Sequence, residues 1–243
     1  WEEENKYILI KKNSDQEFIK KNNLEYKEFD NIKSIWLNKL KIARKEKKKP
    51  NLDYKIITSW NGLMISGYVN AYKAIKDEVF KNEAIEAGEF IYSNLIKKDG
   101  GLFHNYVKGK SKINGYLEDY ATIIQASINL HEITLNELWL ERALDLSEYV
   151  INNFSSNESE LFYFTSIKDD NLISRSVEFR DGVIPSSNSI MANNLFKLYH
   201  YFDKEEYYER SKKMSLSVTQ EFETYPSGYS NWFDLIYNLK SNY

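Results

Sequence analysis

Two neighbouring acidic residues and one histidine are the side chains best suited to proton transfer in this sequence. Glu118 and Asp119 are adjacent, and His104 lies upstream in a short run of aromatic and apolar residues. Carboxylic acids and imidazole are the usual general acids and bases of enzymes. Adjacent helical residues project about 100° apart, so Glu118 and Asp119 do not face each other as a glycosidase pair would. We therefore name Asp119, Glu118 and His104 as candidate catalytic residues.

Each of these residues also has a structural interpretation, which stays open at this point. Glu118 and Asp119 are expected at a helix start, where acidic side chains cap free N–H groups and oppose the helix dipole. His104 is otherwise a surface histidine on an arm. A second carboxylate would come from Asp53 or Asp181, both just upstream of predicted helices, although Asp181 also suits a turn.

Several kinds of chemistry lack their usual residues. The chain has no cysteine, which excludes disulfides, thiol catalysis and cysteine-based zinc sites. Its three histidines show no paired metal-ligand spacing, and no dense carboxylate loop or glycine-rich phosphate loop is present. The sequence therefore predicts neither a metal site nor a cofactor.

Charge and hydropathy limit the partners. The net charge is −3 over 243 residues, and no apolar run has the length of a membrane span. We therefore expect no nucleic-acid or membrane partner, and the absence of cysteine is typical of a cytoplasmic protein. The chain starts at Trp1 without a methionine and stops at Tyr243 within a helical pattern. We interpret it as a piece of a longer protein.

The helices that must position these residues belong to a sequence segment that is repeated three times. Three segments starting at Ser59, Glu118 and Ser186 align without gaps over about thirty residues, with mostly apolar residues at helical spacing. After each first helix the sequence continues with an aromatic residue and then two small residues one turn apart. The aromatic residues are Phe80, Trp139 and Tyr207. Small residues let a second helix approach closely, so each unit is predicted to be a helical hairpin.

The wide spacing of the copies favours a mainly α fold, an incomplete (α/α)6 toroid of repeated hairpins with short β arms. Tetratricopeptide repeats are too short to fit, and a stacked solenoid without a central pocket is the alternative. The runs at residues 101–104 and 160–163 are predicted to form the β arms, which makes His104 equivalent to Tyr163. Residues 1–50 are predicted to hold a strand at 6–12 and a long helix at 26–48, as part of the same toroid. Residues 51–243 hold three hairpins and a C-terminal helix.

Three motifs resemble signatures of one family. LDYKIITSWNGLM at 52–64, GYLEDYA at 115–121 and DGVIPSSNS at 181–189 resemble, in the same order, the signatures of the thioredoxin-domain-containing, spermatogenesis-associated protein family. Tyr54 stands where that family usually has a second aspartate, and Ser187 stands where glycine is common. The first departure weakens a carboxylate pair at Asp53.

The resemblance implies a fold more surely than a reaction. Members of the family join an N-terminal thioredoxin-like domain to an (α/α)6 barrel similar to N-acylglucosamine 2-epimerases and six-hairpin glycosidases. The chain would then be the later part of that barrel, and the thioredoxin-like domain would lie upstream, in the rest of the parent chain.

The repeat places several polar and aromatic residues at equivalent helix starts. Inner-helix N-termini gathered at one mouth offer free N–H groups, which suit hydroxyl-rich ligands, and aromatic rings add stacking faces. The predicted substrate-binding residues are Trp60, Asn61, Tyr120, Asn188, Asp53 and Asp181.

Two functions follow from these observations. One is a carbohydrate-active or sugar-binding domain with a small sugar ligand at the toroid mouth and no assigned reaction, so that catalysis itself stays open. The other is a non-catalytic interaction module that serves a thioredoxin-like domain. Because a partial toroid exposes apolar helix faces, we also expect the fragment to self-associate.

Overall fold

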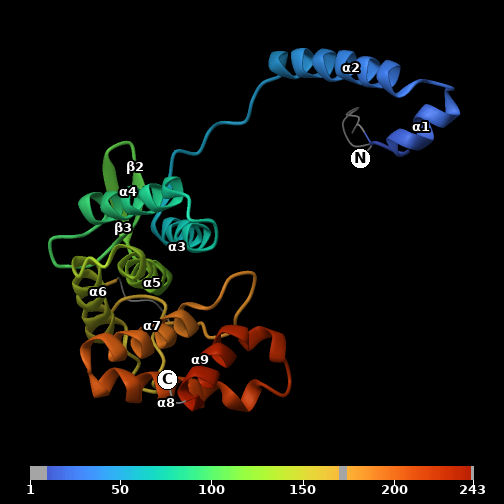
Figure 1. Cartoon of the computed structure of the whole chain (residues 1–243). Coiled ribbons are helices and arrows are strands. Elements are labelled where there is room, and N and C mark those ends of the chain that lie inside the picture. Colours follow the sequence, from blue (N-terminus) through green and yellow to red (C-terminus); the bar gives the residue numbers. More distant parts are fainter. Residues whose placement is uncertain (1–9, 170–173, 242–243) are drawn as a thin grey trace. The chain divides into compact units, whose positions relative to one another are not determined.

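A computed structural model of the chain describes residues 10–169 and 174–241. The chain divides into two compact units, Trp1–Asp53 and Tyr54–Tyr243. Figure 1 shows the helices and strands of each unit. Within the described ranges, no helix has both the length and the apolar character that crossing a bilayer requires. The predicted division at residue 50 lies close to this boundary, whereas the membership of residues 1–50 in the toroid stays a prediction.

The N-terminal unit is a pair of helices, α1 (Asp15–Lys21) and α2 (Tyr26–Glu46). The first begins with a capping box in which Ser14 and Glu17 satisfy each other's backbone N–H groups. Ile19 and Phe29 are the buried apolar residues of the pair. The strand predicted at residues 6–12 falls mainly on residues 1–9, which lie outside the described part, and residues 10–12 are not in a strand.

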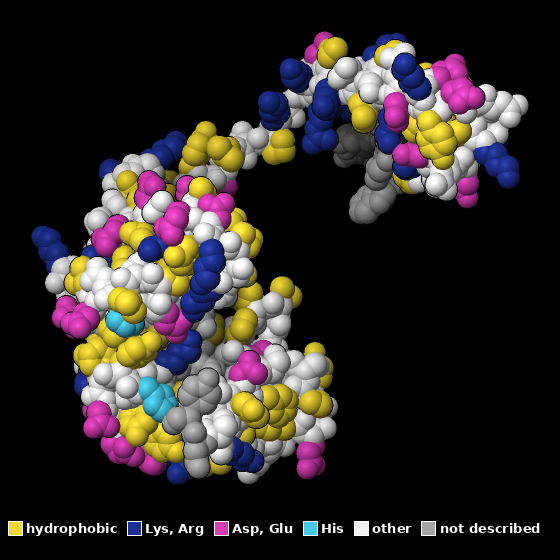
Figure 2. Space-filling model, in the orientation of Figure 1, with side chains coloured by type: hydrophobic (Ala, Val, Ile, Leu, Met, Phe, Trp, Pro, Cys, Tyr) yellow, Lys and Arg dark blue, Asp and Glu magenta, His cyan; other side chains and the backbone are white. Residues whose placement is uncertain are grey.

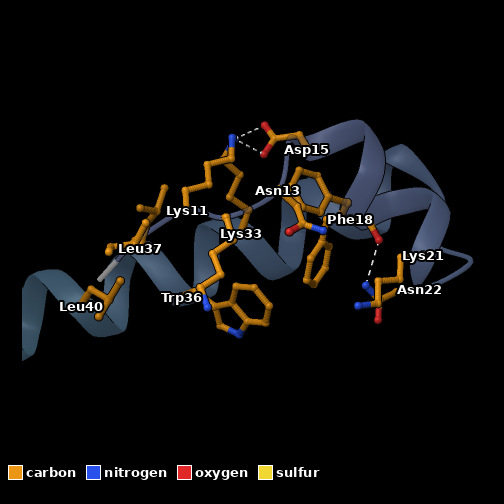
Figure 3. A pocket seen from close by; sticks show the side chains of 13 residues that line it. Lys11, Asn13, Asp15, Phe18, Lys21, Asn22, Lys33, Trp36, Leu37 and Leu40 are labelled. Atoms are coloured by element: carbon orange, nitrogen blue, oxygen red, sulfur yellow. Dashed lines mark hydrogen bonds and ion pairs between the residues drawn. The ribbon is translucent and has the colours of Figure 1, made fainter. Parts of the chain in front are cut away.

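A groove opens between these two helices. Its volume is about 760 Å³, and on its wall Phe18 packs against Trp36 (Figure 3). Phe18 also packs against Phe29. Trp36 and Leu40 are each about half exposed. Apolar side chains on the surface of this unit are visible in the space-filling view (Figure 2). The apolar stripe of α2 is therefore only partly covered by α1.

The second unit contains the three predicted hairpins followed by a C-terminal helix. They are α3 (Thr58–Ile75) with α4 (Glu78–Asn94), α5 (Leu117–Thr134) with α6 (Leu138–Phe154), α7 (Ser187–Phe202) with α8 (Glu205–Val218), and then α9 (Ser230–Lys240). The middle inner helix, α5, packs against α3 on one side and α7 on the other. The predicted fold class, a mainly helical partial toroid, is confirmed.

The three inner helices end in the same way. Lys76, Leu135 and Asp203 adopt left-handed backbone conformations with φ of 61°, 54° and 53°. In each hairpin the N–H group of this residue donates to a carbonyl four residues earlier, at the last position of the repeated stripe. A left-handed residue ends a helix sharply and leads into the turn. The repeat in the sequence thus corresponds to a repeat in backbone geometry.

Small and aromatic residues pack where the repeat predicts. Trp139 and Tyr207 are buried between helices, and Gly88 lies so close to the next hairpin that an added Cβ would be 2.8 Å from Leu130 and Trp139. Close packing of this kind needs the small side chain. The core of the unit therefore runs continuously from one hairpin to the next.

Within residues 10–169 and 174–241, strands form in only the first of the two predicted arms. β1 (Ile56–Ile57), β2 (Phe103–Val107) and β3 (Lys110–Asn114) make an antiparallel sheet in the order β1-β2-β3. The described residues of the second arm form one bridge, between Ser155 and Phe162. The prediction of a second β arm at 160–163 was therefore too strong.

The backbone pairing also corrects the alignment of the arms by one residue. Leu102 bridges to Ile96, and Phe162 bridges to Ser155, so the second loop is one residue longer than the first. His104 is consequently equivalent to Phe164 and not to Tyr163. The sequence match of two Leu-Phe pairs concealed this insertion.

Candidate functional site

Asp119 connects three elements at the N-terminal end of the inner helices. Its side chain is fully buried in the first turn of α5. One carboxylate oxygen, Oδ1, accepts from the Ser59 backbone N–H on α3 at 2.9 Å. The other, Oδ2, accepts from the Tyr116 backbone N–H at 2.9 Å. Asp119 therefore caps its own helix and the neighbouring inner helix, because free N–H groups at both starts need acceptors.

The third partner of Asp119 is His104 on β2. The His104 Nδ1 atom lies 2.9 Å from Oδ2 of Asp119, and the imidazole also contacts the Tyr116 ring edge to face at 4.9 Å. A carboxylate on Nδ1 fixes the ring and leaves Nε2 as the second proton-carrying atom. The fold thus brings two of the three candidate catalytic residues into direct contact.

The contact changes the protonation of both groups. Its hydrogen bond to Asp119 raises the pKa of His104, while partial burial and the charge of Lys55 oppose the change. Burial raises the pKa of the Asp119 carboxyl, and the donors His104, Tyr116 and Ser59 oppose that effect. The imidazole and the carboxylate therefore hold one proton between them more readily than either would alone in water.

Glu118 completes the cluster. It is half-buried beside the pair, and burial followed by the charge of Asp119 raises its pKa. Ser59 Oγ is buried and makes no hydrogen bond of good geometry with the described residues. It nevertheless lies close enough to Glu118 to lower the pKa of the Glu118 carboxyl slightly, against the larger effect of burial. A carboxyl with a raised pKa beside a fixed imidazole is an arrangement suited to general acid–base chemistry.

A second carboxylate near Glu118 comes from a residue that the sequence analysis missed. Glu178 lies in the loop before α7, where Ser187 Oγ donates to its Oε2 at 2.9 Å. Its charge contributes to the raised pKa of Glu118. Of the two candidates from the sequence, Asp181 is used elsewhere. Asp53 is exposed and belongs to the N-terminal unit, so its place in the site stays a prediction. No sequence pattern marks Glu178, since only folding brings its loop to α5.

Asp181 acts as a cap in the third hairpin. It is buried, and its Oδ1 accepts from the Ser186 backbone N–H and from Ser189 Oγ. Its Oδ2 accepts from the Asn231 backbone N–H at 2.9 Å, which joins α7 to α9. The sequence analysis offered a turn as the alternative role of Asp181; in the fold its carboxylate caps backbone N–H groups at the starts of α7 and α9.

The two equivalent residues Tyr120 and Asn188 both lie in the core. Tyr120 Oη accepts from the Leu102 backbone N–H at 2.8 Å, and Asn188 Oδ1 accepts from the Phe162 backbone N–H at 2.8 Å. Leu102 and Phe162 are themselves equivalent bridge residues. In both hairpins, the residue at this position of the repeat therefore hydrogen-bonds the preceding loop to the inner helix that follows it. The polar atoms of Tyr120 and Asn188 do not face an opening.

The first hairpin presents its residues differently. Trp60 is 70% exposed, whereas Asn61 is half-buried and donates from Nδ2 to the Ile57 carbonyl at 2.8 Å. Trp60 directly follows Ser59, whose N–H is bound by Asp119. An exposed aromatic ring one residue from the cluster is available for stacking on a ligand.

The cluster also has the composition of a metal site. One ligand atom each from His104, Glu118 and Asp119 lie within 4.8 Å of one another. The carboxylate of Asp119, however, already accepts from three N–H groups, so a cation would have to displace a cap or the imidazole. The donor set therefore fits a hydrogen-bonded acid–base cluster better than a metal ion.

No protein-family model matches the chain, but individual relatives do. An uncharacterized protein of Caenorhabditis elegans is 31% identical over 235 residues, which are 91% of this chain and 31% of that protein. Human spermatogenesis-associated protein 20 is 30% identical over 175 residues, or 68% of this chain and 22% of that protein. The chain thus spans a third or less of the length of these curated relatives.

Solved structures share the fold at low sequence identity. The GH76 alpha-mannanase of Bacteroides thetaiotaomicron is 18% identical with a TM-score of 0.62, covering 81% of this chain and 55% of that one. Cellobiose 2-epimerase of Bacillus thermoamylovorans is 17% identical with a TM-score of 0.56, covering 67% and 44%. An inactive alpha-1,6-mannanase variant of a Salegentibacter species, with two neighbouring aspartates replaced by asparagine, is 15% identical with a TM-score of 0.54, covering 72% and 49%.

These comparisons agree with the three sequence motifs and with the hairpin architecture. The relatives named spermatogenesis-associated protein 20 are longer proteins, and the solved neighbours are six-hairpin and epimerase-type (α/α)6 proteins. By sequence and by fold, the chain is a partial (α/α)6 toroid related to the spermatogenesis-associated protein 20 family.

Proposed function

We propose that this chain is the sugar-binding part of a carbohydrate-active toroid, with its site at the starts of α3 and α5. The observation that carries the proposal is the hydrogen bond between His104 and Asp119 beside the half-buried Glu118. The groups come from β2 and from the first turn of α5, next to the start of α3.

The chemistry available to this cluster is proton transfer. Asp119 holds the His104 ring through Nδ1, so Nε2 is the atom that can give a proton to a sugar or take one from it. Glu118, whose raised pKa favours the acid form, is the second proton donor. Proton transfer of this kind serves both epimerisation and glycoside hydrolysis, and the reaction of this chain stays unassigned.

Two further observations support a sugar ligand. The exposed Trp60 ring supplies a stacking face beside the polar cluster, which is the usual composition of a sugar pocket. Among proteins of the same fold, the inactive mannanase variant has lost two neighbouring carboxylates, and Glu118 and Asp119 are neighbouring carboxylates in this chain.

A binding and turnover assay tests the proposal. Mannose, glucose, cellobiose and alpha-1,6-mannotriose are titrated against the chain and against the complete parent protein, with thermal shift and product analysis by NMR as readouts. At least one sugar is expected to raise the melting temperature, and His104→Gln is expected to lower any turnover by about 10²- to 10⁴-fold. Glu141→Gln, an exposed acid on α6, is the matched control. Absence of any shift with all four sugars in both proteins would refute sugar binding.

A second candidate function, docking of a thioredoxin-like domain, is favoured by one surface feature. Trp60 and Met64 lie one turn apart on α3 and are 70% and 55% exposed. Apolar residues so exposed suit burial against another domain. The test is calorimetric titration of the chain with the thioredoxin-like domain of the parent protein. Binding that Trp60→Ala and Met64→Ala weaken supports docking, and absence of heat contradicts it.

A further inference from the structure

We propose that Tyr116 is a positioning residue that holds the His104 imidazole with Nδ1 on Asp119 and leaves Nε2 as the atom that meets a ligand. The proposal rests on the proposed function, because it names the residue that orients the predicted acid–base group. Tyr116 acts through His104 and takes no proton itself. It belongs to none of the sequence-predicted site residues.

Tyr116 holds the pair of His104 and Asp119 at two points. Its ring contacts the imidazole edge to face, with 4.9 Å between the ring centroids. Its backbone N–H donates at 2.9 Å to Asp119 Oδ2, the same oxygen that lies 2.9 Å from His104 Nδ1. One residue therefore touches the imidazole directly and also fixes the carboxylate oxygen that the imidazole contacts.

The ring contact supplies what the hydrogen bond alone does not. The χ2 torsion of a histidine has broad, roughly twofold preferences, so the side chain does not select one orientation of its ring. A single hydrogen bond at Nδ1 also lets the ring tilt about the bond. A second contact on the face or edge of the ring restricts both motions. The half-buried Tyr116 ring provides that second contact for His104.

The backbone between the two rings is closely packed. The Gly115 N–H donates at 2.8 Å to the carbonyl of Leu102, two residues before His104. A Cβ at Gly115 would be 2.9 Å from that carbonyl oxygen, so a larger residue would push the two segments apart. Glycine therefore lets Tyr116 start α5 close to the strand that carries His104.

Phe164 supports the Tyr116 ring from the second loop. The two rings are stacked, with centroids 5.1 Å apart and an angle of 12° between their planes. The Phe164 backbone is itself held on both sides, because its carbonyl accepts from the Leu117 N–H at 2.9 Å and its N–H donates to the Ser176 carbonyl at 2.8 Å. Tyr116 cannot rotate away from His104 without losing this stack.

The orientation of the imidazole determines which nitrogen can react. A neutral imidazole carries one N–H, and the hydrogen bond at one nitrogen sets the tautomer. With Nδ1 on the Asp119 carboxylate, the N–H is at Nδ1, and Nε2 can accept a proton from a ligand hydroxyl. A half turn about χ2 would put a ring carbon in place of Nδ1 and would remove this preference.

The tautomer of His104 tests the proposal without any sugar. Nitrogen-15 NMR of the imidazoles reports the tautomer at a pH where His104 is neutral, and His104→Gln assigns its signal among the three histidines. Tyr116→Leu removes the ring and keeps the backbone N–H, so it should lower the ratio of the Nδ1–H to the Nε2–H tautomer about two- to tenfold. Tyr116→Phe keeps the ring and should restore the parent ratio.

Two further variants complete the series. Phe164→Leu removes only the stack behind Tyr116 and should lower the ratio in the same direction but less, and it carries the test alone if Tyr116→Leu does not fold. Phe80→Leu is the matched control, because it breaks an aromatic pair with Tyr68 in the first hairpin, with centroids 6.2 Å apart. It should leave the ratio unchanged.

The outcomes separate the positioning role from the function on which it rests. An unchanged ratio in Tyr116→Leu, or a fall in Phe80→Leu as large as in Tyr116→Leu, overturns the proposal. If the ratio falls as expected but no sugar binds, the proposed function fails and the positioning of His104 stands. With a sugar that is turned over, Tyr116→Leu should lower kcat about two- to tenfold at a nearly unchanged KM. An unchanged kcat would contradict a role in the reaction.

Discussion

Asp119 Oδ2 and His104 Nδ1 are 2.9 Å apart, and the same carboxylate caps the starts of α3 and α5. The capping interpretation of Asp119 is therefore confirmed, and its role in acid–base chemistry stays a prediction. Because the caps fix the carboxylate and the carboxylate fixes the imidazole, the packing of two inner helices determines where His104 lies.

The pH behaviour of His104 provides a first prediction. Its pKa is raised by Asp119, so Asp119→Asn should move the pKa of His104 back toward its ordinary value of 6.5. Since the folded-state pKa lies above the unfolded-state value, the stability that this group contributes is fully present below pH 6.5 and is lost as pH rises through the folded-state pKa. NMR titration of the imidazole and urea unfolding at several pH values check this. An unchanged pKa in Asp119→Asn would contradict the contact.

The hydroxyl of Tyr120 is predicted to stabilise the first loop. Tyr120→Phe leaves the buried Leu102 N–H without its acceptor, which should cost about 1–3 kcal/mol in the free energy of unfolding. Urea denaturation measures the loss, and faster hydrogen exchange of the Leu102 amide locates it. Tyr237→Phe, at a 72% exposed position, is the control and should be nearly neutral. Equal effects of the two substitutions would contradict a specific role for this bond.

Two glycines should respond oppositely to alanine. A Cβ at Gly88 would be 2.8 Å from Leu130 and from Trp139, so Gly88→Ala should destabilise the fold by about 1–3 kcal/mol through overpacking. Gly67 on α3 has nothing within 4 Å of an added Cβ, so Gly67→Ala should stabilise by about 0.5–1 kcal/mol through helix propensity. Thermal and urea unfolding of both variants check the signs. A Gly88→Ala protein at least as stable as the parent would show that the helices are less closely packed.

Self-association of the chain remains a prediction from its exposed apolar surface. Trp36 and Leu40 on α2 are 50% and 47% exposed along one helical stripe. Trp36→Glu with Leu40→Glu should lower the mass measured by light scattering, whereas two such charges at Asn31 and Asn38, which are exposed polar positions on the same helix, should not. A parent chain that is monomeric at high concentration would refute the prediction.

The sequence by itself determined the hairpins. Helical period, small residues such as Gly88 and aromatic residues such as Trp139 act over neighbouring turns, so their spacing can be recognised without knowing the fold. The wide spacing of the hairpins favoured the toroid, and the three motifs added the family. The sequence alignment did not detect the one-residue insertion in the second loop, because a matching Leu-Phe pair does not reveal which backbone groups are bridged.

Only the tertiary structure decided which residues gather at the candidate site. Equivalence in the repeat predicted a common rim for Tyr120 and Asn188, but their side chains bond to buried loop backbone instead. The contact of His104 with Asp119 and the approach of Glu178 to Glu118 join separate elements. Side-chain direction and long-range contact depend on how whole helices and loops pack, and local spacing carries no information about that packing.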